Sequence, residues 1–349
     1  MSAKVSVLGH FGAGETLLNG QTVKTKIITE ELQRRFGREQ VLKIDTHGGW
    51  KTLIKAPFQT IYALKNSRNI LIFPAQNGLR IYAPLLSFFR HFFKGRKLHY
   101  VVIGGWLSQF LTKRKGLAKT LKKFDGIYVE TSTMKSALEA QGFENVFVMS
   151  NCKKLTVLSE NEFVYPQGVP YKLCTFSRVM REKGIEDAVK TVTAVNQSFG
   201  RTVFSLDIYG QVDENQTEWF GALQRTFPDY IRYGGLIPFD KSVETLKEYF
   251  ALLFPTYYEG EGFAGTLIDA YSAGVPVIAS DWKYNTELVN ENVGYVYKTR
   301  DNAALAELLS AMATDPTMIL KKKKSCLYEA EKYKIEKAIG VLLDRMEGN

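Results

Sequence analysis

Cysteine and histidine are scarce in this sequence. Its 349 residues include three cysteines, with no C-x-x-C spacing among them, and four histidines that never fall at the offsets of metal ligands. These shortages argue against a disulfide-bonded secreted domain and against a structural zinc site. They indicate a protein of a reducing compartment.

Long apolar runs are also missing. No stretch reaches the roughly 18 apolar residues that span a bilayer, and the opening MSAKVSVLGH has no charged segment followed by the apolar core of a signal peptide. We therefore expect a cytoplasmic protein that does not cross the membrane. The composition, 45% hydrophobic and 23% charged, is that of a globular protein long enough for two domains.

Acidic residues are absent from residues 80–123, which contain eleven Lys and Arg residues. The first 168 residues carry 25 Lys and Arg against 11 Asp and Glu, a net charge of +14, whereas the remainder carries −4. Phenylalanine and tryptophan side chains are interspersed with the basic ones: Phe88, Phe89, Phe92, Phe93, Trp106 and Phe110. Such a segment favours phosphates or the anionic inner face of the cell membrane, with its aromatic groups in the lipid interface. Packing of the phenylalanines into a domain core is the alternative.

Strand and helix patterns alternate along the whole chain, which predicts an α/β fold. Short apolar runs such as VSVLG, VLKID and GIYVE are separated by segments long enough for crossover helices, and the pattern restarts at KLCTFS. The polar, proline-containing stretch SENEFVYPQGVP reads as a linker. We predict two Rossmann-like, doubly wound domains facing a cleft, at 1–165 and 166–325, with a C-terminal helix at 326–349 that packs back towards the first domain. The four lysines at 321–324 read as a solvated helix start, or as a second lipid contact.

A glycine-rich loop, GHFGAG, follows the first predicted strand and contains Gly12 and Gly14. Backbone at such a loop can approach an anionic ligand closely. The spacing is not G-x-G-x-x-G, but a nicotinamide enzyme remains an alternative, with Asp45 placed to bind a ribose. A tight turn without a ligand is a further alternative.

Two motifs in the second half carry charged residues at the ends of predicted strands. In FSRVMREKG, Arg178 and Lys183 flank a strand-to-helix loop, a layout that can direct two cations at one diphosphate, although surface charge gives the same pattern. In EGFAGTLID, Glu261 and Asp269 flank a glycine-rich loop and helix start. Both carboxylates can therefore line one elongated ligand.

These motifs resemble the retaining glycosyltransferases of family 4, which have the GT-B fold. The resemblance rests on the glycine loop after the first strand, on S-R-x-x-x-E-K-G, and on E-G-F-x-G followed by A-x-S-A-G-V-P-V-I-A-S-D. It is nearest to bacterial capsule and exopolysaccharide enzymes. It implies transfer of a hexose from a nucleotide diphosphate sugar, with UDP the preferred carrier, to a lipid-linked or glycan acceptor, without a metal or other cofactor.

The resemblance also implies roles for individual residues. Arg178 and Lys183 would bind the donor diphosphate, and Glu261 would orient the donor sugar. Asp269 would contact the ribose, although the family has glutamate there. Further donor contacts would come from Gly12, Gly14, Gly210, Gly262, Phe263, Ala264, Gly265 and Thr266. Gly105 and Trp106 would lie on the acceptor side, where many relatives have a histidine, and His99 is expected to be structural.

The implied mechanism is front-face attack with retention, in which the leaving phosphate deprotonates the acceptor and no side chain acts as base. Two other classes of protein stay open. A non-catalytic GT-B partner protein would keep the fold while losing donor groups such as the glutamate replaced by Asp269. A nucleic-acid-binding protein would explain the charge but would not need the carboxylate loop, so we expect no nucleic acid partner.

Overall fold

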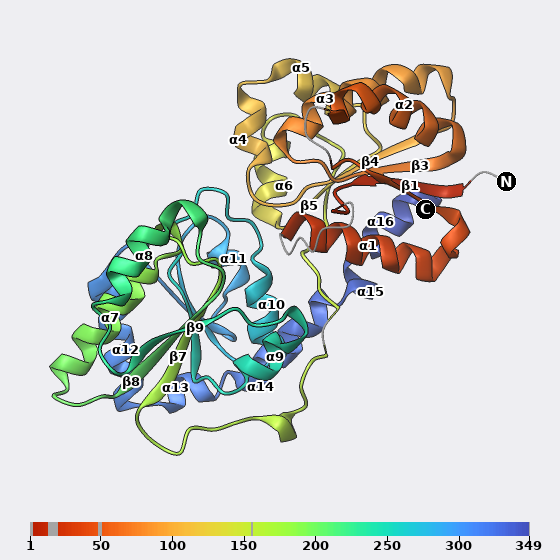
Figure 1. Ribbon diagram of the computed structural model, residues 1–349. Helices are drawn as coiled ribbons and strands as arrows, with labels where there is room; N and C mark the ends of the chain where they lie inside the picture. The colour runs from red at the N-terminus through yellow and green to blue at the C-terminus, as the bar shows by residue number, and fades with distance from the viewer. Residues whose placement is uncertain (1–2, 13–19, 48–50, 155, 349) are drawn as a thin grey trace. The chain divides into compact units, whose positions relative to one another are not determined.

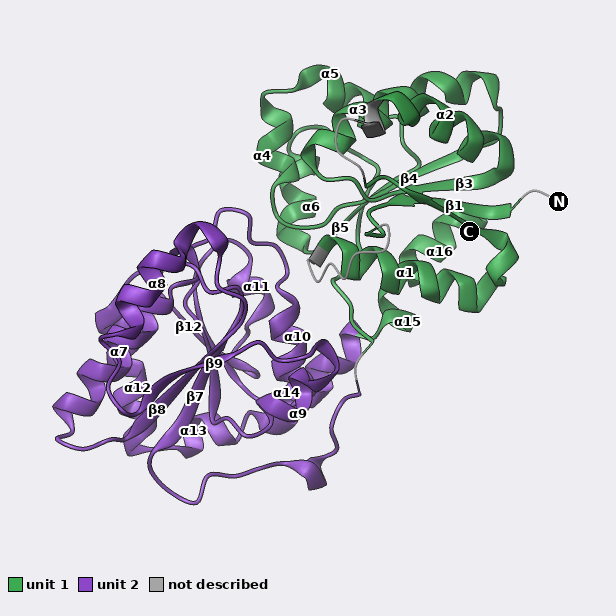
Figure 2. Cartoon of the chain, in the orientation of Figure 1, with its two compact units in different colours: residues 1–154, 334–349 green, residues 155–333 purple. Residues whose placement is uncertain are grey.

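The chain forms two units, each built on its own parallel sheet. The structure is a computed structural model and describes residues 3–12, 20–47, 51–154 and 156–348. Unit 1 comprises residues 1–154 and 334–349, and unit 2 comprises residues 155–333 (Figures 1 and 2). This architecture confirms the predicted α/β fold class with two Rossmann-like domains.

The sheet of unit 1 has six parallel strands in the order β2-β1-β3-β4-β5-β6. Its strands are β1 (Ala3–Gly9), β2 (Val41–Asp45), β3 (Ser67–Ile72), β4 (Lys97–Val101), β5 (Gly126–Val129) and β6 (Val146–Val148). Its helices are α1 (Gly20–Phe36), α2 (Lys51–Asn66), α3 (Gln76–Phe89), α4 (Leu107–Thr112), α5 (Lys115–Leu121), α6 (Ser132–Glu139), α15 (Ile335–Ala338) and α16 (Gly340–Glu347), with short 3-10 turns η1 (Arg38–Gln40) and η2 (Arg90–Phe92). Helices α2 and α3 lie on one side of the sheet, and α1 and α16 on the other (Figure 1).

The sheet of unit 2 also has six parallel strands, in the order β12-β11-β10-β7-β8-β9. Its strands are β7 (Tyr171–Phe176), β8 (Phe204–Tyr209), β9 (Ile231–Gly235), β10 (Ala251–Phe254), β11 (Val277–Ser280) and β12 (Gly294–Tyr297). Its helices are α7 (Ile185–Ser198), α8 (Thr217–Gln224), α9 (Ser242–Leu246), α10 (Gly265–Ser272), α11 (Asn285–Leu288), α12 (Asn302–Thr314), α13 (Thr317–Leu320) and α14 (Lys323–Ala330). Its 3-10 turns are η3 (Glu160–Glu162), η4 (Arg181–Lys183), η5 (Glu214–Gln216), η6 (Phe239–Lys241) and η7 (Glu331–Tyr333).

The strands read as almost continuous apolar runs because helices cover both faces of a parallel sheet. In unit 1, Val5 and Val7 of β1 pack in one cluster with Leu32 of α1 and Leu342 of α16. Helices pack through one apolar face each. The sequence pattern therefore specifies which face of each element is buried.

Helix α7 shows this relation between sequence and packing in unit 2. Ile185, Val189 and Val192 recur at helical spacing and are all buried in the core. Glu186 and Asp187 stand in its first turn, where a negative charge interacts favourably with the helix dipole. The helix thus begins directly after the loop that carries Lys183.

The unit boundaries differ from those expected from the sequence. The chain enters unit 2 at residue 155 rather than 166, because the Leu158 N–H donates to the Ser272 carbonyl oxygen at 2.9 Å and Glu160 pairs with Lys324 at 2.9 Å. The stretch taken as a linker is polar because it runs over the surface of unit 2. At the other end, residues 326–333 stay with unit 2, where the Tyr333 ring packs edge-on against Phe263. Only residues 334–349 join unit 1.

Among the described residues, no single helix has both the length and the apolar composition to cross a membrane. The helices at Asn302–Thr314 and Thr317–Tyr333 pass that test only as a pair bent by 96°. Leu305, Leu309 and Met312 of the first member are buried in the core of unit 2.

Candidate functional site

The sheet of unit 2 changes its winding direction between β7 and β10. From β7 the chain continues to β8 on one side, and it later returns to β10 on the other. In doubly wound sheets, ligands bind at the carboxyl ends of the strands that flank this point. Arg178 and Lys183 follow β7, and Glu261 follows β10, so the topology brings the two sequence motifs to the same edge.

Lys183 and Glu261 form a direct ion pair at this edge. Lys183 Nζ lies 2.6 Å from Glu261 Oε2, and both side chains are largely buried, with exposed fractions of 12% and 7%. The Thr256 hydroxyl donates to the same carboxylate oxygen at 2.7 Å. The ammonium group also lies over the Tyr258 ring, 5.0 Å from its centroid. Burying a charged pair costs desolvation free energy, and such pairs are frequent at functional sites.

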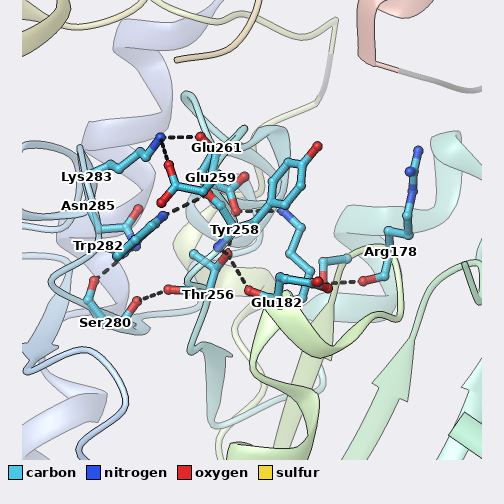
Figure 3. Close-up of polar contacts among 12 residues, drawn as sticks. Arg178, Glu182, Thr256, Tyr258, Glu259, Glu261, Ser280, Trp282, Lys283 and Asn285 are labelled. Atoms are coloured by element: carbon cyan, nitrogen blue, oxygen red, sulfur yellow. Dashed lines mark hydrogen bonds and ion pairs between the residues drawn. The ribbon is translucent and has the colours of Figure 1, made fainter. Parts of the chain in front are cut away.

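The loop after β10 is held by hydrogen bonds from neighbouring loops (Figure 3). The Ser280 hydroxyl donates to the Thr256 carbonyl oxygen at 2.6 Å, and the Trp282 indole N–H donates to the Tyr258 carbonyl oxygen at 2.8 Å. From the β7 side, the Glu182 carbonyl oxygen accepts from the Tyr257 N–H at 2.7 Å. The Glu261 carboxylate is therefore positioned by loops that follow three adjacent strands. Sequence reasoning identified Glu261 but assigned no role to Thr256, Ser280 or Trp282, although Ser280 lies within the motif that ends in V-I-A-S-D.

Two glycines allow the loops at this edge to pack closely. Gly184 has φ 71°, and a Cβ atom there would lie 2.1 Å from the Pro255 carbonyl oxygen. Gly210, at the end of β8, has φ 136°, and a Cβ there would lie 1.7 Å from the Ser177 carbonyl oxygen. Only glycine combines that backbone conformation with so close an approach. The structure thus gives Gly210, predicted as a donor contact, a packing role against the loop that carries Arg178.

Arg178 stands at the same edge but is not part of the Lys183–Glu261 contact. Its side chain is 56% exposed, and its Nη1 lies 3.5 Å from Asp213 Oδ2. Figure 3 shows it extending away from the labelled residues around Glu261. An exposed pair of this kind contributes little free energy, so the guanidinium is free to exchange Asp213 for another anion.

The first turn of α10 presents backbone donors next to this pair. Gly262 and Phe263 are buried, Ala264 is the N-cap, and Gly265 and Thr266 open the helix. The first N–H groups of a helix have no acceptor within it, which makes a helix start suited to anions. Thr266 Oγ1 is buried and has no hydrogen-bond partner within the part of the chain that the structure describes. A ligand hydroxyl or phosphate at this turn would supply one.

Asp269 lies inside α10 and is 2% exposed. Among the described residues, no group of three or more His, Cys, Asp or Glu side chains is arranged to hold a metal ion.

In unit 1, the glycine loop after β1 is only partly described. Gly12 is buried with φ 83°, whereas Gly14 lies outside the described residues. Gly105 is buried and Trp106 is half-buried after β4. The Trp106 indole N–H donates to the Ile103 carbonyl oxygen at 2.8 Å, and its ring packs edge-on against Phe110. The indole N–H of Trp106 is therefore already bonded within its own loop.

His99 is a core residue, as expected from the sequence. Its Nδ1 lies 3.0 Å from Tyr128 Oη and its Nε2 3.2 Å from Asn69 Oδ1. Complete burial lowers the pKa of His99 to about 4, so the ring is neutral at physiological pH. Hence His99 has a structural role rather than a catalytic one.

The aromatic side chains of residues 80–123 do not all enter the core. Phe88 and Phe92 are exposed by 61% and 71%, whereas Phe110 is buried. Helix α2, which packs against α3, adds an apolar stripe that sequence reasoning missed. The exposed members of this stripe are Ile54, Phe58 and Tyr62, at successive intervals of four residues.

Comparison with known protein families finds a match for unit 2. Residues 162–333 match the family model described as Glycosyl transferases group 1. The matched segment makes up almost the whole of unit 2. It includes every strand of the unit 2 sheet and both members of the Lys183–Glu261 pair.

Individual relatives are distant. The chain is 26% identical over 193 residues to the UDP-N-acetylglucosamine–peptide N-acetylglucosaminyltransferase GtfA subunit of Streptococcus gordonii, a match that covers 54% of this chain and only 37% of that relative. The chain therefore spans well under two thirds of its curated relative.

Solved structures share the fold over almost the whole chain. Sucrose-phosphate synthase from Thermosynechococcus elongatus superposes with a TM-score of 0.76 at 15% identity, covering 99% of both chains. HepE of Anabaena, solved in complex with UDP, superposes with a TM-score of 0.74 at 12% identity, covering 99% of this chain and all of that one. These likenesses confirm the GT-B fold.

Proposed function

We propose that the protein is a retaining glycosyltransferase that moves a hexose from a UDP-sugar to a lipid-linked or glycan acceptor in bacterial surface polysaccharide synthesis. The observation that carries the proposal is the buried Lys183–Glu261 pair at the switch point of a glycosyl transferases group 1 domain, beside the open first turn of α10. HepE, solved with UDP, supports UDP as the nucleotide. The motifs of family 4 support retention.

Each group at the site has a task in this reaction. Lys183 and the helix start of α10 attract the donor diphosphate, and Arg178 leaves Asp213 to join them. The Glu261 carboxylate then accepts hydrogen bonds from donor sugar hydroxyls while Thr256 keeps it oriented. Asp269 is proposed to contact the ribose. The cationic groups stabilise the negative charge that develops on the leaving diphosphate, so we propose that no metal or other cofactor is needed.

The transfer exchanges one bond at the anomeric carbon. The bond from that carbon to the diphosphate oxygen breaks while a bond to the acceptor oxygen forms on the same face. The acceptor hydroxyl proton passes to the leaving phosphate oxygen, so no side chain serves as base. Trp106 and Gly105 are proposed to contact the acceptor.

Ligand-dependent thermal stability tests the donor class. A ligand at a hundred times its Kd stabilises the folded state by about 2.7 kcal/mol, so UDP and its sugars should raise Tm while CMP does not. The shift should disappear in Arg178→Ala and Lys183→Ala. Lys190→Ala is the matched control, because Lys190 is an exposed lysine of α7 paired with Glu186. No shift with any nucleotide would overturn the proposal, and a shift without sugar transfer would favour a non-catalytic partner protein.

We also propose that unit 1 binds the anionic inner face of the membrane. The exposed apolar side chains of α2, α3 and η2, together with the eleven basic residues of 80–123, match the composition of an interfacial surface. The double variant Phe58→Ser, Phe92→Ser should lose sedimentation with phosphatidylglycerol vesicles. Leu236→Ser, an equally exposed apolar position in unit 2, is the control. Equal binding by all three proteins, or equal binding to pure phosphatidylcholine, would overturn this surface.

A further inference from the structure

Two histidines bond to each other at the carboxyl edge of the unit 1 sheet. His10 follows β1 and His47 follows the neighbouring strand β2. His47 Nδ1 lies 2.6 Å from His10 Nε2, and the rings meet edge-to-face with centroids 4.4 Å apart. His10 Nδ1 lies 2.8 Å from the hydroxyl of Thr22, a fully buried residue in the first turn of α1. The hydroxyl and the two rings thus form one hydrogen-bonded chain.

Asp45 fixes the backbone on both sides of this pair. Its Oδ1 accepts the N–H of Phe11 at 3.1 Å and the N–H of His47 at 2.9 Å. One carboxylate oxygen therefore joins the two loops that carry the histidines. Asp45, considered from the sequence as a ribose-binding acid, thus holds together the two loops that carry the imidazole pair.

Proton counting shows what the pair can present to a ligand. The facing nitrogens share one proton, because two facing N–H groups would repel each other. When the pair takes up one further proton, His10 Nδ1 donates to Thr22 and His47 Nε2 carries an outward N–H. In this state the pair holds a single positive charge and one free donor.

The outward nitrogen belongs to an exposed side chain. His47 is exposed, and within residues 3–12, 20–47, 51–154 and 156–348 its ring is bonded through Nδ1 and not through Nε2. From Gly20, where its described part begins, α1 has no acidic residue in its first turn, and the first 168 residues carry a net charge of +14. A protonated donor in these surroundings favours an oxyanion.

We propose that the His10–His47 pair is a phosphate-binding group of unit 1, which binds one phosphate oxygen through His47 Nε2 when the pair is protonated. His47 contacts the ligand and His10 is a positioning residue. Which phosphate it meets, that of the donor nucleotide or that of a lipid-linked acceptor, rests on the proposed function. The binding of phosphate itself does not.

NMR of the full-length protein labelled in its histidine rings tests this site, with inorganic phosphate as the probe at pH 6 and pH 8. Phosphate should shift the His10 and His47 signals together and bind at least about tenfold more tightly at pH 6, since a hydrogen bond to a charged group contributes about 1.5–3 kcal/mol. His47→Gln should lose this binding. His10→Gln should keep an exposed His47 but bind phosphate more weakly, because the ring that fixes the orientation of His47 is lost. His91→Gln, at an exposed histidine bonded to the Phe88 carbonyl oxygen, should change nothing.

Two further titrations identify the source of the phosphate. Shifts of the pair with UDP would assign it to the donor, and shifts with a short prenyl phosphate but not with UDP would assign it to a lipid-linked acceptor. Equal phosphate binding by wild type and His47→Gln, or equal affinity at the two pH values, would overturn the proposal. Failure of the proposed function would appear separately, as loss of any UDP effect on Tm while the phosphate shifts of the pair remain.

Discussion

Gly184 lies against Pro255 so closely that any larger residue must move one of the two loops. A Cβ atom on Gly184 would stand 2.1 Å from the Pro255 carbonyl oxygen, and Lys183 precedes this glycine directly. The contact therefore sets the separation between the loop after β7 and the loop that leads to Glu261. The geometry of the Lys183–Glu261 ion pair therefore requires glycine at position 184.

Gly184→Ala should be far more damaging than the same change at Gly200. Both glycines have positive φ, 71° and 62°, but nothing lies within 4 Å of a Cβ at Gly200. Gly200→Ala should cost only the backbone strain of about 1–2 kcal/mol, whereas Gly184→Ala should cost more and also weaken nucleotide binding. Urea unfolding and the nucleotide-dependent Tm shift measure both effects. Equal losses at the two positions would contradict the proposed role of the Pro255 contact.

Removing one member of the Lys183–Glu261 pair should destabilise unit 2 more than removing both. Lys183→Met leaves a buried carboxylate without its countercharge, at a cost of about 3 kcal/mol. Adding Glu261→Gln should recover most of this loss, because an amide oxygen still accepts from Thr256. Lys190→Met, which breaks an exposed pair, should cost at most about 0.5 kcal/mol. Urea unfolding at pH 7 checks the cycle, and strictly additive losses would show that the pair does not interact.

The motifs located the site, but they did not specify its contacts. Lys183 and Glu261 belong to recognisable patterns because their chemistry needs charge at a strand end, and the parallel topology brings the two strand ends together. Their direct contact depends on a loop fixed by Thr256, which belongs to no motif, and by Ser280, to which the motif assigned no role. Likewise, the pairing of His10 with His47 follows from the neighbouring positions of β1 and β2. A single sequence does not contain that adjacency.

Burial was the property least visible in the sequence. The four lysines at 321–324 read as a solvated helix start, yet Lys322 and Lys323 are buried, with Lys323 only 1% exposed. Their ammonium groups lie over aromatic rings supplied by other segments: Lys322 Nζ over Tyr295 and Lys323 Nζ over Phe163. The reverse holds for Phe58, an apolar residue left exposed at the surface. Composition gives the average tendency of a residue type, and tertiary packing overrides it at individual positions.

Lys323→Met should stabilise the protein at neutral pH and lose that advantage at high pH. Burial lowers the pKa of Lys323 to about 8 from 10.5, so between these values the unfolded chain binds more protons than the folded one. The free energy of unfolding of the wild type therefore gains from this residue as pH rises from 8 to 10.5. The variant should be more stable by about 1–3 kcal/mol at pH 7. In the wild type, the Phe163 and Tyr165 rings offset part of the free energy that desolvation of the Lys323 ammonium group costs.

Lys324→Met is the control for this pH dependence, since Lys324 is exposed and pairs with Glu160. The difference between Lys324→Met and wild type should stay flat from pH 7 to pH 10.5 in urea unfolding. If Lys323→Met shows the same flat difference, the buried ammonium group of Lys323 does not cause the change in the free energy of unfolding between pH 7 and pH 10.5.

Leu342→Ala should destabilise unit 1 and leave unit 2 intact. Leu342 of α16 is fully buried in the cluster that contains Val5, so its truncation should cost about 2–5 kcal/mol. Hydrogen exchange should show lost protection in β1 and α1 but unchanged protection in β7 and β10. Gly340→Ala, in the same helix with open space around it, should be neutral or slightly stabilising. Uniform loss of protection in both units would indicate that they unfold as one.

Unit 1 is interrupted in sequence, and this has a consequence for how the protein is made. The last strand of its sheet ends at Val148, but α16, which covers β1 together with α1, begins at Gly340, after the whole of unit 2. At a synthesis rate of about 5–20 residues per second, the partly covered sheet waits roughly 10–40 s on the ribosome for α16. Meanwhile unit 2 emerges complete and can fold first. A nascent chain of this kind presents an apolar sheet face to the cell for long enough to make it a natural client of ribosome-bound chaperones.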